Sequence, residues 1–253
     1  MGLLSSIFRT EPKPQAKPAA KKGRPRQTAV SSLERSKVDV SPSINRPVRP
    51  VSIYIDGEWH EDGHWYVLSY AFDKRHTGWL YNEFYLDSNG QPVCIGTEEH
   101  DWWNNGRMVH YRFPRYMEKS KKWLCRSKIQ ELLAGVQNIY VYGPDIGRLE
   151  QEFGLSLKAK YNCYNLLKAY KTLEPGRKTY QLCDLEKEAG IHRETEIYKH
   201  GNIAKCHRDW ADPKLRRRAL LYNKEDSINL LRVKEYLYNK HHVSKADENK
   251  WKL

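Results

Sequence analysis

Four carboxylates in three short segments have types and spacing suited to metal chemistry. Asp56 and Glu58 end an apolar, strand-like run, Asp145 follows a second such run, and Asp226 comes late in the chain. On a strand, side chains at i and i+2 share a face, so Asp56 and Glu58 can reach the same ions. Four clustered carboxylates need cations among them, and Mg²⁺ or Mn²⁺ are usual for ligand sets of oxygen alone. The pattern predicts phosphoryl-transfer chemistry on nucleic acid.

Each acid also has a purely structural explanation when taken alone. Asp56-Gly57 is a favoured turn pair. Asp145 stands where a strand gives way to a helix, and an acid there stabilises the helix N-terminus. Asp226 fits a solvated helix face, although Tyr222, four residues earlier, projects from the same face. The functional interpretation therefore depends on the three segments converging in space.

The overall charge indicates a polyanionic partner. The chain has 253 residues, a net charge of +13 and a pI near 9.4. Nucleic acid is the first expectation and an anionic membrane surface the second. No run of about eighteen apolar residues exists, which excludes a transmembrane helix. Five cysteines without a CxxC pair indicate reduced thiols and an intracellular protein, cytoplasmic or nucleoid/nuclear. A zinc site from His200, Cys206 and His207 is conceivable, but no second ligand pair has finger-like spacing.

The first 49 residues differ from the rest and are predicted to be a disordered basic tail. Residues 1–50 carry +8 of the net charge, are rich in proline and have few aromatic residues. One cluster resembles an AT-hook, a segment that lies in the minor groove of DNA; its basic residues are Lys21, Lys22, Arg24 and Arg26. Gly2 also fits the myristoylation pattern, which predicts weak membrane attachment only in a host that has the transferase.

Residues 50–241 are predicted to form one mixed α/β domain, followed by a C-terminal tail at 242–253. The expected strands span 51–55, 65–72, 79–86 and 138–142. The expected helices span 116–134, 145–153, 165–170, 181–189 and 215–239. The Trp-rich segment around 102–106 has a loop-like composition. Strands followed by alternating helices favour a mixed central sheet flanked by helices.

The order of the acidic segments resembles the DEDD superfamily of 3′–5′ exonucleases, which have a ribonuclease H-like fold. That family has Asp-x-Glu on its first strand, an Asp opening a helix and, in the DEDDy subtype, a late Tyr-x-x-x-Asp helix. The segment 182–193, Leu-Cys-Asp-Leu-Glu-Lys-Glu-Ala-Gly-Ile-His-Arg, extends the resemblance to the YprB-like ribonuclease H-like domains. The resemblance covers about residues 51–240.

The resemblance implies a role for each acid. Asp56 would bridge two Mg²⁺ or Mn²⁺ ions, Glu58 and Asp226 would hold one of them, and Asp145 would help to hold the other. Tyr222 would position the attacking water. The basic residues expected to contact the substrate strand are, besides the four in the tail, Arg148, Arg216 and Arg217.

Two alternatives to an exonuclease remain open. The protein could be a non-catalytic nucleic-acid-binding or scaffold protein on the same fold, or a structure-selective endonuclease, because a fold does not determine cleavage polarity. The choice between DNA and RNA, single-stranded or unpaired, is also open.

Overall fold

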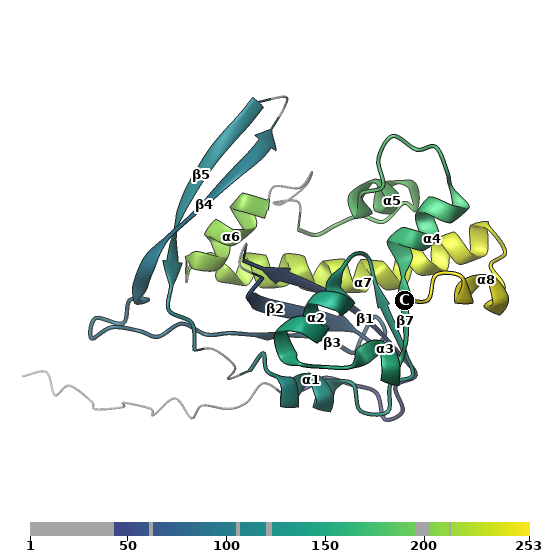
Figure 1. Ribbon diagram of the computed structural model, residues 1–253, viewed down its shortest axis with the longest axis horizontal. Coiled ribbons are helices and arrows are strands. Elements are labelled where there is room, and N and C mark those ends of the chain that lie inside the picture. The colour runs from purple at the N-terminus through teal and green to yellow at the C-terminus, as the bar shows by residue number, and fades with distance from the viewer. Residues whose placement is uncertain (1–42, 61–62, 105–106, 120–122, 196–202, 213) are drawn as a thin grey trace, which may run out of the picture. The chain divides into compact units, whose positions relative to one another are not determined.

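Five strands form one mixed sheet in the order β3-β2-β1-β6-β7 (Figure 1). The computed structural model describes residues 43–60, 63–104, 107–119, 123–195, 203–212 and 214–253. The strands of this sheet are β1 (Ser52–Trp59), β2 (Trp65–Ala71), β3 (Thr77–Tyr81), β6 (Asn138–Val141) and β7 (Asn162–Asn165). Strands β1, β2 and β3 pair antiparallel, while β6 and β7 join β1 in parallel. The mixed α/β architecture predicted from the sequence is confirmed.

Alternating residues of β1 face two different helical layers. Ile53 and Ile55 pack against α1 (Arg126–Leu132) and α2 (Asp145–Phe153). Tyr54, on the opposite face, belongs to the apolar cluster that includes residues of α4 (Leu166–Leu173), α5 (Leu182–Glu188) and α7 (Arg216–Lys240). Asp56 and Glu58 follow Tyr54 at two-residue steps. The pleat of β1 therefore directs both carboxylates toward the side of the sheet that α7 covers.

Residues 102–104, within the segment expected to be loop-like, belong to a long antiparallel hairpin formed by β4 (Cys94–Asn104) and β5 (Arg107–Tyr116). Charged residues along β4 break the apolar alternation by which a strand is recognised. The Asn-Gly pair at 105–106 was the available sequence signal, because that pair favours a two-residue hairpin turn. Figure 1 shows the hairpin extending beyond the sheet, with α6 (Ile203–Ala211) beside it.

One helix prediction was wrong at its start, and one helix was missed. Helix α1 begins at Arg126 rather than at 116, because Met117 and Glu118 continue in extended conformation: the Met117 amide donates to Val93 at 2.8 Å, and Glu118 bridges to Phe84. Helix α6 was not expected. Helix α7 and α2 are confirmed, the latter ending at Gly154 in the left-handed conformation that glycine favours. The short α3 (Leu157–Lys160) precedes β7.

The segment 242–253 is not a tail but packs against the sheet. It contains α8 (Lys245–Asn249), whose buried Glu248 accepts a hydrogen bond from Tyr140 Oη at 2.6 Å. Trp251 is only 2% exposed. At the N-terminal end of the described residues, the backbone N–H of Asn45 donates a hydrogen bond to Tyr70 Oη at 2.9 Å. The predicted tail up to residue 42 lies outside the described residues.

Gly57 makes room for a core tryptophan. A Cβ at this position would lie 1.9 Å from Trp65 Cζ3, and Trp65 is fully buried. We expect Gly57→Ala to lower the free energy of unfolding by about 1–3 kcal/mol, because overpacking forces the indole out of its site. Urea denaturation measures this change. The matched control is Gly147→Ala on α2, where a new Cβ meets nothing within 4 Å. It should be stabilising, and equal effects of the two substitutions would contradict the packing argument.

Candidate active site

Three of the four predicted acids converge. One carboxylate oxygen each from Asp56, Glu58 and Asp226 lie within 4.8 Å of one another. The first two share a face of β1, and Asp226 comes from α7, which packs across β1 and β2. Acids from opposite ends of the domain sequence are thus brought to one point by the crossing of a strand and a helix.

Asp145 stands beside this group. It is the first residue of α2, is buried, and its charge raises the pKa of both Asp56 and Glu58. Its position at the N-terminus of α2 is the one expected from sequence. Arg148, one turn further along α2, lies 4.5 Å above the ring centroid of Trp59, and its charge acts to lower the pKa of Asp145.

Burial and mutual repulsion make the acidic group costly to ionise. Burial first, and then the charges of Asp226 and Asp145, raise the pKa of Glu58 to about 8. Burial also raises the pKa values of Asp145 and Asp226 to about 7, and that of Asp56 well above its usual range. In the absence of cations the group therefore retains protons near neutral pH, whereas positive charge among the oxygens would favour full ionisation.

Arg193 is a basic residue in direct contact with the acidic group. Its guanidinium donates to Asp226 Oδ1 and forms a bidentate ion pair with Glu186. In this pair Nε lies 2.5 Å from Glu186 Oε2 and Nη2 lies 2.7 Å from Glu186 Oε1. The side chains of Arg193, Glu186 and Asp226 are 6%, 2% and 7% exposed. Because all three side chains are buried, the contact with Arg193 holds Asp226 in position. Only Oδ1 of Asp226 takes part in this contact, and Oδ2 lies outside it.

A second contact fixes Asp56. The side-chain amide of Asn223, on α7, donates to Asp56 Oδ2 at 2.6 Å. The backbone carbonyl of Asn223 accepts from Ser69 Oγ on β2 at 2.6 Å, and Ser69 Oγ lies 2.5 Å from Ser227 Oγ. This buried network couples α7 to the sheet at the level of the acids, so the carboxylates are held by rigid elements rather than by loops.

Tyr222 lies one turn before Asp226 on α7. The Arg193 guanidinium lies 4.9 Å from its ring centroid. Burial and the charge of Asp226 raise the pKa of Tyr222 above its usual range. The phenol therefore stays protonated at neutral pH and can orient a neighbouring group through hydrogen bonding, but it cannot act as an ionised base.

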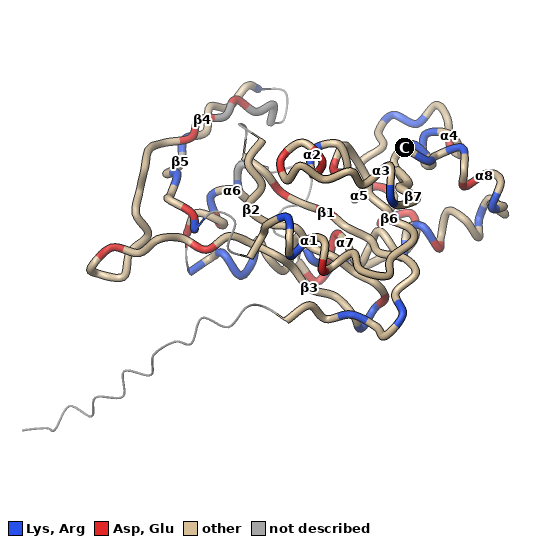
Figure 2. Tube along the Cα trace, turned by 60° about the horizontal axis from the view of Figure 1, so that its bottom comes forward, with Lys and Arg blue, Asp and Glu red and all other residues tan. Residues whose placement is uncertain are grey.

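The predicted nucleic-acid contacts have different surroundings. Arg217 is exposed, whereas the Arg216 guanidinium lies 3.7 Å from the ring centroid of Phe84 and donates to the Trp210 carbonyl at 3.2 Å. Arg216 thus packs against aromatic residues of the apolar cluster that includes Phe84 and Trp210. The four basic residues of the tail, Lys21, Lys22, Arg24 and Arg26, lie outside the described residues, as does Gly2. Figure 2 shows both signs of charge interspersed along the described chain.

Sequence reasoning missed the supporting residues. Arg193 appeared as the last residue of the segment 182–193, with no role beside the acids, and Asn223 had no motif beyond its place next to Tyr222. The available signal for Arg193 was its distance of seven residues from Glu186, across the turn that follows α5. Only the fold shows that this turn delivers the guanidinium to Asp226.

Within the described residues, no helix combines the length and apolar character needed to cross a membrane.

The match to a protein family agrees with this geometry. A family model described as the RNase_H superfamily matches residues 103–238. Asp145, Tyr222 and Asp226 lie inside this span, whereas β1 with Asp56 and Glu58 precedes it. No curated protein and no solved structure matches the chain. With more than half of its residues matched and its acids arranged around a mixed five-stranded sheet, the chain belongs to the RNase H superfamily.

Proposed function

We propose that the protein is a metal-dependent 3′–5′ exonuclease acting on single-stranded or unpaired nucleic acid. The observation that carries the proposal is the convergence of Asp56, Glu58 and Asp226 within 4.8 Å, with Asp145 beside them. Membership of the RNase H superfamily supports a nuclease. The DEDDy-like order of the acids and Tyr222 supports the finer assignment to exonucleases.

The ligand set fits Mg²⁺ or Mn²⁺. All candidate ligands are carboxylates, which are hard oxygen donors, and because burial raises their pKa values, positive charge among them would favour their ionisation together. Asp56, Glu58 and Asp226 would hold one ion, and Asp56 with Asp145 a second. When bound, two such ions would supply the Lewis acidity that activates a water and stabilises negative charge developing on the phosphodiester oxygens.

The remaining groups position the reactants. Tyr222, as a neutral phenol, would orient the attacking water by donating or accepting a hydrogen bond. Arg193 and Asn223 hold Asp226 and Asp56 in place, and so the ligands need little reorganisation when substrate binds. Arg217 and the basic residues of the tail would contact phosphates and retain the substrate.

The direct test is digestion of single strands labelled at the 3′ or the 5′ end, as DNA and as RNA, with Mg²⁺, with Mn²⁺ or with EDTA. The proposal predicts stepwise shortening from the 3′ end that stops in EDTA. Internal cuts in strands with blocked 3′ ends would identify an endonuclease. Retained binding without cleavage under any metal condition would contradict the proposal and identify a non-catalytic nucleic-acid-binding protein.

Tyr222→Phe provides a separate test of the water-positioning role. We expect kcat to fall by about 10²-fold, because one positioned hydrogen-bonding group is lost, while KM changes little. Steady-state digestion of a short labelled strand measures both constants. Tyr236→Phe is the matched control: this tyrosine also lies on α7, but its hydroxyl donates to Glu188 at 2.7 Å, away from the acids. Equal activities of the two variants would remove Tyr222 from the mechanism.

A further inference from the structure

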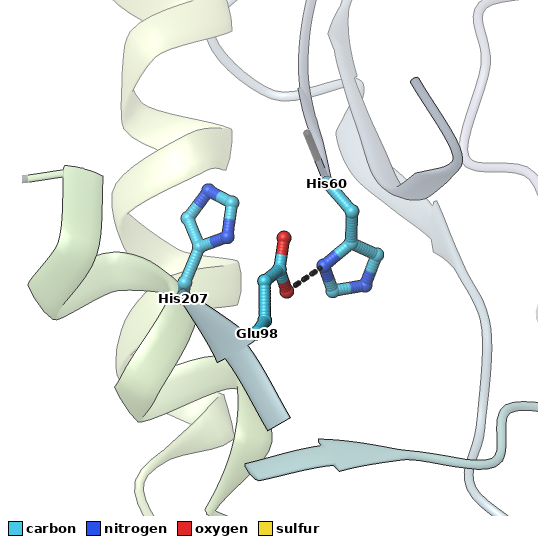
Figure 3. Close-up of side chains that lie close together, drawn as sticks. All are labelled: His60, Glu98 and His207. Atoms are coloured by element: carbon cyan, nitrogen blue, oxygen red, sulfur yellow. Dashed lines mark hydrogen bonds and ion pairs between the residues drawn. The ribbon is translucent and has the colours of Figure 1, made fainter. Parts of the chain in front are cut away.

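A second cluster of metal-ligating side chains lies outside the acidic site. His60 follows the last residue of β1, Glu98 belongs to β4, and His207 to α6. These residues are 8%, 9% and 3% exposed. Figure 3 shows the Glu98 carboxylate between the two imidazole rings. Three elements far apart in sequence therefore deliver two imidazoles and a carboxylate to one buried point.

The cluster is compact enough for one ion. One ligand atom from each of the three residues lies within 4.8 Å of the other two, and His60 Nδ1 is 2.9 Å from Glu98 Oε2. A cavity of about 10 Å³ adjoins the cluster, and its lining includes all three side chains. This volume is close to the minimum that admits a single water, so the space fits an ion and excludes a larger ligand.

A second carboxylate is placed to orient His60. The other ring nitrogen of His60, Nε2, lies 3.4 Å from Glu118 Oε1. Glu118 is itself held by the Trp210 indole at 3.2 Å and the Asn82 amide at 3.1 Å. Histidines that bind metals commonly donate their second N–H to a carboxylate, which sets the tautomer and raises the basicity of the binding nitrogen. Nδ1 of His60 is thereby directed toward Glu98 and the cluster.

We propose that His60, Glu98 and His207 form a Zn²⁺ site that fastens the β4–β5 hairpin and α6 to the end of β1. Two imidazoles and one carboxylate are a ligand set that Zn²⁺ uses in proteins, whereas Mg²⁺ and Ca²⁺ prefer oxygen ligands alone. Ligand atoms about 2.0–2.2 Å from a tetrahedral zinc lie about 3.4 Å apart. Binding would therefore replace the hydrogen bond of 2.9 Å between His60 Nδ1 and Glu98 Oε2, opening this pair slightly, and all three ligand atoms already lie within 4.8 Å of one another. The fourth position would hold a water or the second Glu98 oxygen.

The fold, rather than local spacing, creates this site. The conceivable zinc ligands read from the sequence were His200, Cys206 and His207, which are close along the chain. Among the described residues the ligand group contains His207 but not Cys206, and His200 lies outside them. The partners of His207 in this group are His60, which follows β1, and Glu98 of β4. The site stands apart from the proposed nuclease activity, and its test does not depend on cleavage.

The test begins with metal content. The full-length protein, saturated with Zn²⁺ and freed of loosely bound metal, should retain about one Zn²⁺ per chain by elemental analysis. His207→Gln and Glu98→Gln should each reduce the content to background. His110→Gln is the matched control, because His110 also pairs with a carboxylate of the same hairpin, Asp101 at 2.7 Å, but is exposed. That variant should retain the zinc.

Zinc in the acidic site must be distinguished from zinc in the cluster. Asp56→Asn should leave the zinc content unchanged, and the zinc X-ray absorption spectrum of the unmodified protein should show imidazole scattering. This spectrum needs no variant and so remains informative if a substituted protein fails to fold. Zinc lost in Asp56→Asn but retained in His207→Gln, a spectrum without imidazole, or no retained zinc at all would each overturn the proposal.

The role of Glu118 gives a graded readout. Glu118→Gln keeps the shape of the side chain but weakens its ability to accept from His60. We expect zinc affinity, measured by competition with a chromophoric chelator, to fall by about 10–100-fold without loss of the one-to-one stoichiometry. An unchanged affinity would overturn the assignment of Glu118 as the positioning residue of His60.

Discussion

Asp56→Asn is expected to abolish cleavage while leaving the protein folded. The Asp56 carboxylate lies among the other acids and is a ligand of both cations in the proposed mechanism. Its loss removes both ligand charge and electrostatic stabilisation of the transition state. We expect kcat/KM to fall by about 10³-fold or more, measured by single-turnover digestion in Mg²⁺.

The same substitution should not cost stability in EDTA. The charges of Asp226, Asp145 and Glu58 oppose ionisation of Asp56, so a neutral amide relieves repulsion. An asparagine carbonyl can still accept from Asn223. We expect the free energy of unfolding to stay constant or to rise by about 1 kcal/mol.

The matched control for Asp56→Asn is Asp101→Asn, at an exposed acid on the hairpin. It should leave cleavage unchanged. A fully active Asp56→Asn protein would refute the assignment of the acidic group as the catalytic centre, whatever its affinity for nucleic acid.

Arg193→Gln is expected to produce the largest loss of stability among the substitutions considered. Its guanidinium is the cation in contact with the buried carboxylates of Glu186 and Asp226. Removing one partner of a buried ion pair leaves uncompensated charge and costs about 3–5 kcal/mol. Urea denaturation in EDTA measures the change. Adding Mg²⁺ should restore part of the loss, since a bound cation also compensates Asp226.

A second substitution distinguishes lost charge pairing from lost packing. In the Arg193→Gln background, Glu186→Gln should recover stability, because it removes a carboxylate that has lost its partner. The control is Arg217→Gln, an exposed position on α7, with an expected change within about 0.5 kcal/mol. If Arg193→Gln were as mild as this control, the ion pair would not hold the site together.

Local patterns in the sequence were sufficient where chemistry follows from neighbouring residues. The i, i+2 relation of Asp56 and Glu58, the glycine that ends α2 and the long α7 are all short-range features. The DEDDy-like order of acids correctly indicated a ribonuclease H-like sheet. The same reasoning failed for the hairpin, because charged residues interrupt its alternation, and for the start of α1, where bridges to Val93 and Phe84 override helix propensity.

The sequence by itself indicated four acids as candidate cation ligands and predicted the strand and the helices that carry them. Only the tertiary structure decided which cationic and polar side chains reach them: Arg193 contacts Asp226, Asn223 contacts Asp56, and Arg216 is turned into an apolar cluster. It also brought His60, Glu98 and His207 together from three elements. The physical reason is that periodicity encodes the direction of a side chain within one element. Its partners across elements depend on the packing of the whole chain.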